Sequence, residues 1–458
     1  MTGPAWSDCG PPSGALDGVR VLDLSRVLAG PYLTMMLGDL GAEVVKVEPP
    51  GGDETRTWGP PFHEGTTTYF LSVNRNKRSC SLDLTDVEQR AALLSLATTA
   101  DIVVENFRPG VAERLGVGCE QLRELNPALV YCSISAFGNA PQARSLPGYD
   151  LLVQAVGGLM SVTGSTESGP TKTGVAVVDV LAGTHACAGV LSALRHAECT
   201  GTGQRVEVSL LQTLFSSLVN QRSAYLCTGQ VPEPMGNAHP SLAPYETYAA
   251  ADGSLGLAVG NDRQFAALTT ALGAPELAQD PRFATNPARV AHRSELRVEL
   301  EGSLGALTVR EACRVLTGSG VPAGPVNDLP GAFELAVELG LRPIVDVGPT
   351  QHAVPVAASP LSLSATPAPT VDPHRPRAPS TSREHSTGAA GLTPEADPRP
   401  CPIPPREPER HFHGDRTTPG TAGPVRHRSA DRRRGPSDPR HRPALRNRPT
   451  APPPGAVV

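Results

Sequence analysis

Residues 16–221 alternate between short apolar runs and longer amphipathic segments, and this pattern constrains the fold more than any other feature. The runs at 19–24, 43–48, 102–105 and 129–134 predict strands, because Val, Ile and Leu dominate them. Segments 31–41 and 86–100 predict helices between those strands. Strands that alternate with helices form a largely parallel sheet covered on both faces. The sequence therefore predicts an α/β fold for this half of the chain.

The turn after the first strand tests whether such a sheet binds a dinucleotide. Dinucleotide folds need G-x-G-x-x-G there, so that the backbone can approach a pyrophosphate. Residues 25–31 instead have the sequence Ser-Arg-Val-Leu-Ala-Gly-Pro, with one glycine followed by a proline. Glu48 at the end of the second strand imitates the ribose-binding acid, but without the glycines we do not expect NAD binding.

One carboxylate, Asp179, stands out among apolar neighbours. Residues 175–178 predict the end of a buried strand that leads into it. A stripe of small residues at helical spacing, including Ala182, Ala186 and Ala193, predicts a helix after it. Two interpretations are open. Asp179 is an ordinary helix N-cap, or it is a poorly solvated carboxylate that serves as a nucleophile.

The second half of the chain changes character twice. Residues 224–321 combine a strand-like alternation at 253–260 with helical patterns at 262–272 and 293–304, which predicts a smaller α+β domain. From residue 369 onward the chain holds 20 Pro and 16 Arg, but no Tyr, Trp, Met or Lys. A segment so poor in apolar residues cannot offset its chain entropy by burial, so disorder is predicted there.

Charge and cysteine usage exclude several functions. The net charge is −5, and the segment after residue 368 contributes +7, so the first 368 residues carry −12. That acidic body offers no basic face for nucleic acid. The nine cysteines lack CxxC pairs and zinc spacing, which is typical of reduced thiols in a cytoplasm. We found no signal peptide and no run of about 18 apolar residues, so neither secretion nor a membrane span is expected.

Six segments together resemble the class III (CaiB/BaiF-type) coenzyme A transferases, a family related to formyl-CoA transferase and α-methylacyl-CoA racemase. In order they are Leu-Asp-Leu-Ser-Arg-Val-Leu-Ala-Gly-Pro at 22–31, Leu-Gly-Ala-Glu-Val-Val-Lys-Val-Glu-Pro at 40–49, Asn-Arg-Asn-Lys-Arg at 74–78, Val-Glu-Asn-Phe-Arg-Pro-Gly at 104–110, Gly-Thr-Gly-Gln at 201–204 and Gly-Asn-Ala-His-Pro at 236–240. The resemblance covers about residues 15–367, and the fixed order of the segments makes it specific.

The resemblance implies a Rossmann-like parallel sheet in a large CoA-binding domain, residues 15–222, followed by a smaller α+β domain, residues 223–325. Residues 326–367 would return to the large domain, and two such chains would form a homodimer of interlocked rings. Residues 1–14 are expected to be a flexible N-terminus. Residues 368–458 are expected to be a disordered Pro/Arg-rich tail, whose composition resembles a gene read in a shifted frame.

The resemblance also implies the reaction. CoA would move from an acyl-CoA to a carboxylic acid in acyl-CoA metabolism, with no permanently bound cofactor and no metal. Asp179 matches the nucleophile that forms an aspartyl anhydride and then an aspartyl-CoA thioester. The family's racemases carry a histidine where this chain has Tyr149, which is a poor base at neutral pH and is expected to line the acyl pocket. Racemisation is therefore the alternative reaction, and an inactive CoA-binding protein damaged at its C-terminus is the alternative from another class.

Further site residues follow from the family's motifs, position by position. Arg114, which matches a phosphate-binding arginine, has the alternative of a solvated helix residue. His239, in the acceptor site, has the alternative of a turn histidine with a structural hydrogen bond. The predicted CoA-binding residues are Leu28, Ala29, Asn106, Phe107, Arg108 and Arg114, and the predicted acceptor-site residues are His239, Gly260 and Asn261.

Overall fold

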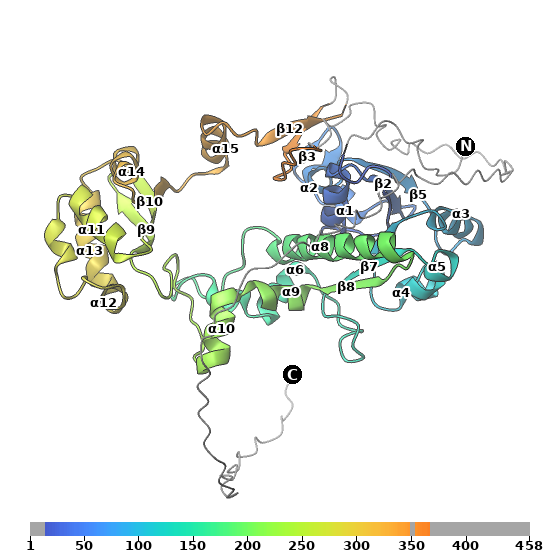
Figure 1. The fold of residues 1–458 in the computed structure, drawn as a ribbon, viewed down its shortest axis with the longest axis horizontal. Coiled ribbons are helices and arrows are strands. Elements are labelled where there is room, and N and C mark those ends of the chain that lie inside the picture. Colours follow the sequence, from blue (N-terminus) through green and yellow to red (C-terminus); the bar gives the residue numbers. More distant parts are fainter. Residues whose placement is uncertain (1–13, 349–352, 367–458) are drawn as a thin grey trace, which may run out of the picture. The chain divides into compact units, whose positions relative to one another are not determined.

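The computed structural model describes residues 14–348 and 353–366. Within them, six parallel strands form one sheet in the order β5-β2-β1-β6-β7-β8 (Figure 1). The strands are β1 (Arg20–Asp23), β2 (Glu43–Glu48), β5 (Lys77–Ser81), β6 (Ile102–Glu105), β7 (Val130–Ser135) and β8 (Arg205–Ser209). The order reverses between β1 and β6, because β1 pairs with β2 on one side and with β6 on the other. This is the Rossmann order, and it confirms the predicted α/β fold.

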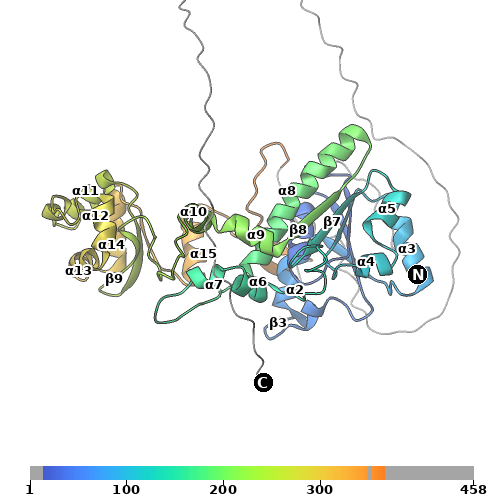
Figure 2. The same ribbon diagram turned by 90° about the horizontal axis from the view of Figure 1, so that it is seen from below.

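Alternation along the strands supplies a core to each face of the sheet. Val21, Val44 and Val104 belong to one apolar cluster, while Leu22, Val45 and Val103 belong to the other. Figure 2 shows the strands between α8 and α9 on one side and α3 and α5 on the other. The covering helices are α1 (Ala29–Asp39), α8 (Val177–Thr200) and α9 (Leu210–Ser217) on the first face, and α3 (Val87–Ala97), α4 (Val111–Arg114) and α5 (Cys119–Leu125) on the second.

Helix α8 is the central helix of the first face. Its small residues allow close packing on α1, since a Cβ added to Gly183 would lie 2.7 Å from the carbonyl oxygen of Ala29. In the described part of the chain, α8 is long and apolar enough to cross a membrane, with a mean hydropathy of 1.6. However, half of its apolar window is buried in the core, including Ala182, Ala186 and Val190. Core packing therefore accounts for its composition.

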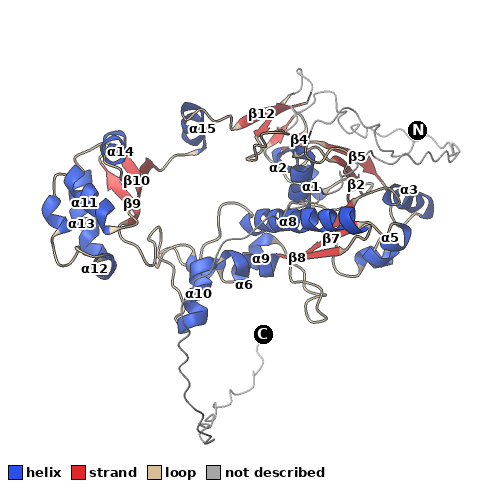
Figure 3. Ribbon diagram, in the orientation of Figure 1, coloured by secondary structure: helices blue, strands red, loops and turns tan. Residues whose placement is uncertain are grey.

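A separate sheet and core form further along the chain. The strands β9 (Tyr245–Ala250), β10 (Gly253–Ala258) and β11 (Ala323–Pro325) are antiparallel, in the order β11-β10-β9. Figure 3 shows them next to helices, and they share an apolar cluster with α11 (Asp262–Ala271), α13 (Arg293–Leu304) and α14 (Val309–Gly318). This is the smaller α+β unit that the pattern predicts.

The other described elements are shorter or lie between these two sheets in the sequence. They are η1 (Glu54–Thr57), β3 (Phe62–His63), β4 (Thr66–Thr67), α2 (Thr68–Val73), α6 (Asp150–Val156), α7 (Leu159–Val162), α10 (Val219–Thr228), η2 (Pro275–Ala278), α12 (Asn286–Ala291), α15 (Leu329–Glu338), β12 (Ile344–Val347) and β13 (Val354–Ala357). The boundary expected at residue 222 falls inside helix α10. This boundary and the other domain limits stay predictions.

One local prediction was wrong. Residues 175–178 form no strand: Val175 is exposed, and α8 already begins at Val177. A short apolar run fits a strand and a helix start equally well, and here the N–H groups of Val178 and Asp179 donate to the Asp150 carboxylate, which caps a helix start. The expected tail, residues 368–458, lies outside the described residues, as does nearly all of the expected flexible N-terminus.

Candidate active site

An open pocket of about 160 Å³ lies at the point where the strand order reverses. Open α/β sheets bind ligands at the carboxyl ends of the strands at this position, since the loops diverge there. Residues 26–29, which follow β1, form one wall, and residues 106–109, which follow β6, form another. Residues 134–136 and 146–149, together with Glu54, Asp179 and Leu210, complete the lining.

Asp179 is the third residue of α8, and it lines this pocket. The residue is only 9% exposed. Burial, and secondarily the charge of Asp150, raise the pKa of Asp179 from 3.8 to about 7. Near neutral pH a large fraction of this carboxyl is therefore ionised yet poorly hydrated, which is the state that a carboxylate nucleophile requires.

The start of α8 is capped by Asp150, the first residue of α6. The backbone N–H groups of Val178 and Asp179 donate to Asp150 Oδ1 at 2.8 and 3.2 Å. Gln154 donates to the other carboxylate oxygen of Asp150, and its own Oε1 accepts the Thr173 N–H at 3.0 Å. Asp179 is therefore not the helix cap, and its N-cap interpretation is wrong.

Tyr69 in α2 is a further group near the carboxylates, and sequence reasoning missed it. Burial, then the charges of Asp179 and Asp150, raise the pKa of Tyr69 to about 12. Its ring meets that of Trp58 edge-on, with 5.4 Å between the centroids. The hydroxyl is therefore neutral at physiological pH and keeps its proton.

The structure brings five of the predicted CoA-binding residues together on the pocket: Leu28, Ala29, Asn106, Phe107 and Arg108. Arg108 is exposed, and the Arg26 guanidinium lies 5.7 Å from the centre of the Phe107 ring. Tyr149 also lines the pocket and is 57% exposed. Their roles toward CoA stay predictions, since the geometry gives their positions alone.

Arg114 is not among the residues that line the pocket. It ends α4, is exposed, and donates from Nη1 to the Gly110 carbonyl at 3.0 Å. An exposed arginine with one backbone partner fits both a phosphate contact and a solvated helix residue, so both interpretations stay open.

The predicted acceptor-site residues also lie away from the pocket lining. Asn261 caps α11 by accepting the Gln264 N–H at 2.9 Å, and the Gly260 N–H donates to Gln264 Oε1 at 2.9 Å. His239 Nδ1 accepts the Ser241 N–H at 3.0 Å. Each residue has a structural hydrogen bond, and an acceptor role for them stays a prediction.

No cluster of three or more His, Cys, Asp or Glu side chains suited to a metal ion occurs among residues 14–348 and 353–366. The described pocket combines the nearly buried Asp179 with apolar residues such as Leu28 and Ala29, and charged residues, Arg26, Glu54 and Arg108, also line it.

The chain belongs to CoA-transferase family III, whose family model matches residues 16–380. Its relatives include a succinate–glutarate CoA-transferase of Agrobacterium fabrum, 42% identical over 77% of this chain and 90% of the relative. A succinyl-CoA:mesaconate CoA-transferase of Haloarcula hispanica is 40% identical, over 79% of this chain and 95% of the relative.

A solved structure agrees with the sequence comparison. The crystal structure of a CaiB/BaiF family protein from Brucella suis superposes with a TM-score of 0.71 and 40% sequence identity, covering 79% of this chain and 95% of the other. The predicted family resemblance is confirmed, and the protein is an enzyme of the CoA-transferase type.

Proposed function

We propose that the enzyme moves CoA from an acyl-CoA to a carboxylic acid through covalent adducts of Asp179. The carboxylate attacks the thioester carbonyl, which forms a mixed anhydride and releases the CoA thiolate. The thiolate then attacks the aspartyl carbonyl, so that the acyl group leaves as a carboxylate and an aspartyl-CoA thioester remains. The acceptor acid repeats these two steps in reverse, which yields the new acyl-CoA and regenerates Asp179.

The observation that carries this proposal is the state of Asp179: a carboxylate that lines the pocket, is nearly buried, and has its pKa raised to about 7. Burial removes the hydration that makes an exposed carboxylate a weak nucleophile. Asp150 accepts the N–H groups of Val178 and Asp179, so those donors do not hold down the attacking carboxylate. Tyr149, which lines the same pocket, is proposed to contact the acyl group.

The substrate class is proposed from the relatives. Their names include succinate, glutarate and mesaconate, which are dicarboxylic acids of four or five carbons. We propose succinyl-CoA or a similar acyl-CoA as donor and a dicarboxylic acid as acceptor. In the proposed complex Leu28, Ala29, Asn106, Phe107 and Arg108 contact CoA. Arg114 would contact a phosphate, and His239, Gly260 and Asn261 would belong to the acceptor site.

A product assay tests the reaction. The protein is incubated with succinyl-CoA and a panel of acids, including glutarate, mesaconate, oxalate and acetate, and new CoA esters are identified by mass spectrometry. Hydroxylamine added during turnover should convert Asp179 to a hydroxamate, found by peptide mapping. Asp179→Ala is the control. A transfer rate in that variant within tenfold of the wild-type rate would contradict the proposed mechanism.

We also propose that the enzyme is a cytoplasmic homodimer that binds neither nucleic acid nor membranes. Helices α10 and α15 have no buried residue, although they carry Tyr225, Leu226, Leu335 and Val337. The exposed apolar side chains of these helices need a covering surface, and a second copy of the chain is the proposed partner. Light scattering after size-exclusion chromatography measures the mass, and a monomer would contradict the proposal.

A further inference from the structure

Val27, in the pocket wall after β1, has an unusual backbone conformation. Its φ is +68°, in the left-handed region that a β-branched side chain rarely adopts. The residue lies between β1 and α1, and it directly precedes Leu28 and Ala29 on the pocket. A strained residue at such a position persists only where its surroundings hold it.

The side chain of Asn106 holds Arg26, the residue before Val27, through the backbone N–H and the backbone carbonyl of Arg26. The Arg26 N–H donates to Asn106 Oδ1 at 2.8 Å, and Asn106 Nδ2 donates to the Arg26 carbonyl at 2.7 Å. Asn106 follows β6, the strand beside β1 at the point where the strand order reverses. This amide therefore joins the two loops that form two walls of the pocket.

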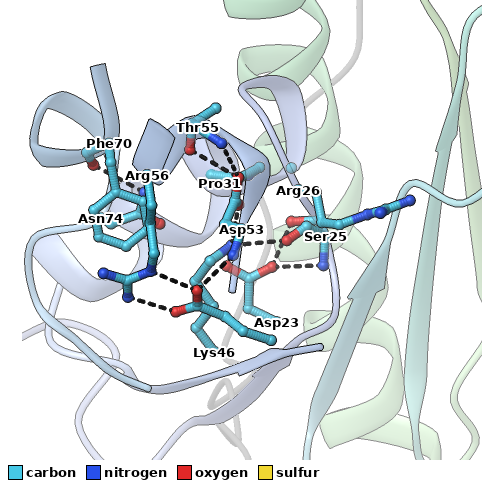
Figure 4. A network of polar contacts seen from close by, with 12 residues as sticks. Asp23, Ser25, Arg26, Pro31, Lys46, Asp53, Thr55, Arg56, Phe70 and Asn74 are labelled. Atoms are coloured by element: carbon cyan, nitrogen blue, oxygen red, sulfur yellow. Dashed lines mark hydrogen bonds and ion pairs between the residues drawn. The ribbon is translucent and has the colours of Figure 1, made fainter. Parts of the chain in front are cut away.

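A buried ionic network fixes the chain one residue earlier (Figure 4). The Ser25 N–H donates to Asp23 Oδ1 at 3.0 Å, and Lys46 Nζ donates to the Ser25 carbonyl at 2.8 Å. Lys46 also lies 2.9 Å from Asp53 Oδ2, and Lys77 lies 3.1 Å from Asp23 Oδ2. These contacts fix the backbone of Ser25 at the start of the loop, and the Asn106 side chain fixes the following residue, Arg26.

On the other side, the first turn of α1 packs directly on Ser25. A Cβ added to Gly30 would overlap Ser25 Cβ and Oγ, so the glycine allows the contact. Val27 itself packs with Leu28, Met35 and Val73. The loop is consequently anchored at Ser25 and at Gly30, and its strained residue lies between these anchors.

We propose that Asn106 is a positioning residue, whose side chain keeps Val27 in the left-handed conformation and so preforms the Leu28–Ala29 wall for the acyl-CoA. Both the oxygen and the nitrogen of its amide already have backbone partners, so this role acts through the loop. The inference rests on the proposed function in one respect: CoA is taken as the ligand that contacts Leu28 and Ala29.

The test is a pair of comparisons. Asn106→Ala should raise the KM for acyl-CoA about tenfold, as expected for losing a pair of hydrogen bonds, and change kcat less than about threefold, because Asp150 still holds the start of α8. In a Val27→Gly background the same substitution should cost less than about threefold in KM, since glycine adopts positive φ without strain. Asn106→Asp, which keeps the acceptor but loses the donor, should fall between wild type and Asn106→Ala.

A ligand-free measurement separates this inference from the proposed function. Amide hydrogen exchange at Arg26 should accelerate at least tenfold in Asn106→Ala, with exchange in α8 unchanged. Equal increases in KM in the two Val27 backgrounds, or unchanged exchange at Arg26, would overturn the proposed positioning role of Asn106. Faster exchange at Arg26 in a protein that binds no CoA would support the positioning role of Asn106 and would contradict CoA as the ligand of the pocket. If Asn106→Ala does not fold, Asn106→Asp serves in both comparisons.

Discussion

Replacing Asp179 by Asn should stabilise the folded protein at pH 8 while it abolishes CoA transfer. The pKa of Asp179 is about 7 in the folded protein, against 3.8 for an unperturbed aspartate. Between those values the folded state binds more protons than the unfolded state. The free energy of unfolding therefore falls as the pH rises from about 4 to about 7, and it levels off above that window.

The gap between the two pKa values sets the size of the effect. At about 1.36 kcal/mol for each pH unit, the ionised carboxylate destabilises the fold at pH 8 by on the order of 4 kcal/mol. At pH 4.5 the carboxyl is protonated in the folded state and already largely ionised in the unfolded state, so Asp179→Asn should stabilise the fold there by only about 1 kcal/mol. The substitution should therefore raise the melting temperature at pH 8 by several degrees more than at pH 4.5.

Thermal unfolding at both pH values measures this difference, and Glu88→Gln is the matched control. Glu88 is also in the first turn of a helix, α3, but it is exposed. Removing its charge should lower stability slightly at pH 8, because the helix loses a favourable interaction with its dipole. A wild-type protein that is as stable as Asp179→Asn at pH 8, or more stable, would refute the reasoning.

Individual contacts carry three more predictions. Asp150→Asn should shift the pH midpoint of kcat/KM below the midpoint near 7 that we expect for the wild type, because it removes the second cause of the raised Asp179 pKa; a pH–rate profile checks this. Arg114→Ala should weaken CoA binding by about 1–3 kcal/mol at low salt and by less at high salt, as calorimetry can measure. Gly183→Val should lower stability by about 1–3 kcal/mol in thermal melts, because its side chain would meet the Ala29 carbonyl.

The sequence predicted the central strands of the large sheet but not its edges. Strands β1, β2, β6 and β7 are apolar runs, because both of their faces are covered. The two missed strands, β5 and β8, are the edges of the sheet. The sequence of β5, Lys-Arg-Ser-Cys-Ser, is almost wholly polar, and that of β8, Arg-Val-Glu-Val-Ser, alternates two valines with charged residues, so neither gives a continuous apolar run.

The candidate site was predictable where the signal was local. A charge among apolar residues is enough to single out Asp179 in the sequence. Its partners could not be found in the same way: Asp150 precedes it by 29 residues, and Tyr69 lies in a different helix. Only the fold brings these groups together. The same distant residue, Asp150, caps the start of α8, so the sequence near residues 175–178 could not show that a helix begins there.

The pocket differs in kind from a dinucleotide site on the same sheet order. A glycine-rich turn exposes backbone N–H groups to a pyrophosphate, whereas this loop is fixed by side chains: Asn106 on Arg26, and Lys46 on Ser25. Burial alone would raise the pKa of Asp23 beneath the loop, but Lys77 and Lys46 lower it to about 2, so this support stays charged at any physiological pH. Leu28, Ala29 and Asp179 line the pocket at the switch point, together with a second acid, Glu54. A pyrophosphate beside these carboxylates would be repelled, so we expect the thioester end of acyl-CoA beside Asp179 and its phosphates on the side of the pocket that the exposed Arg108 lines.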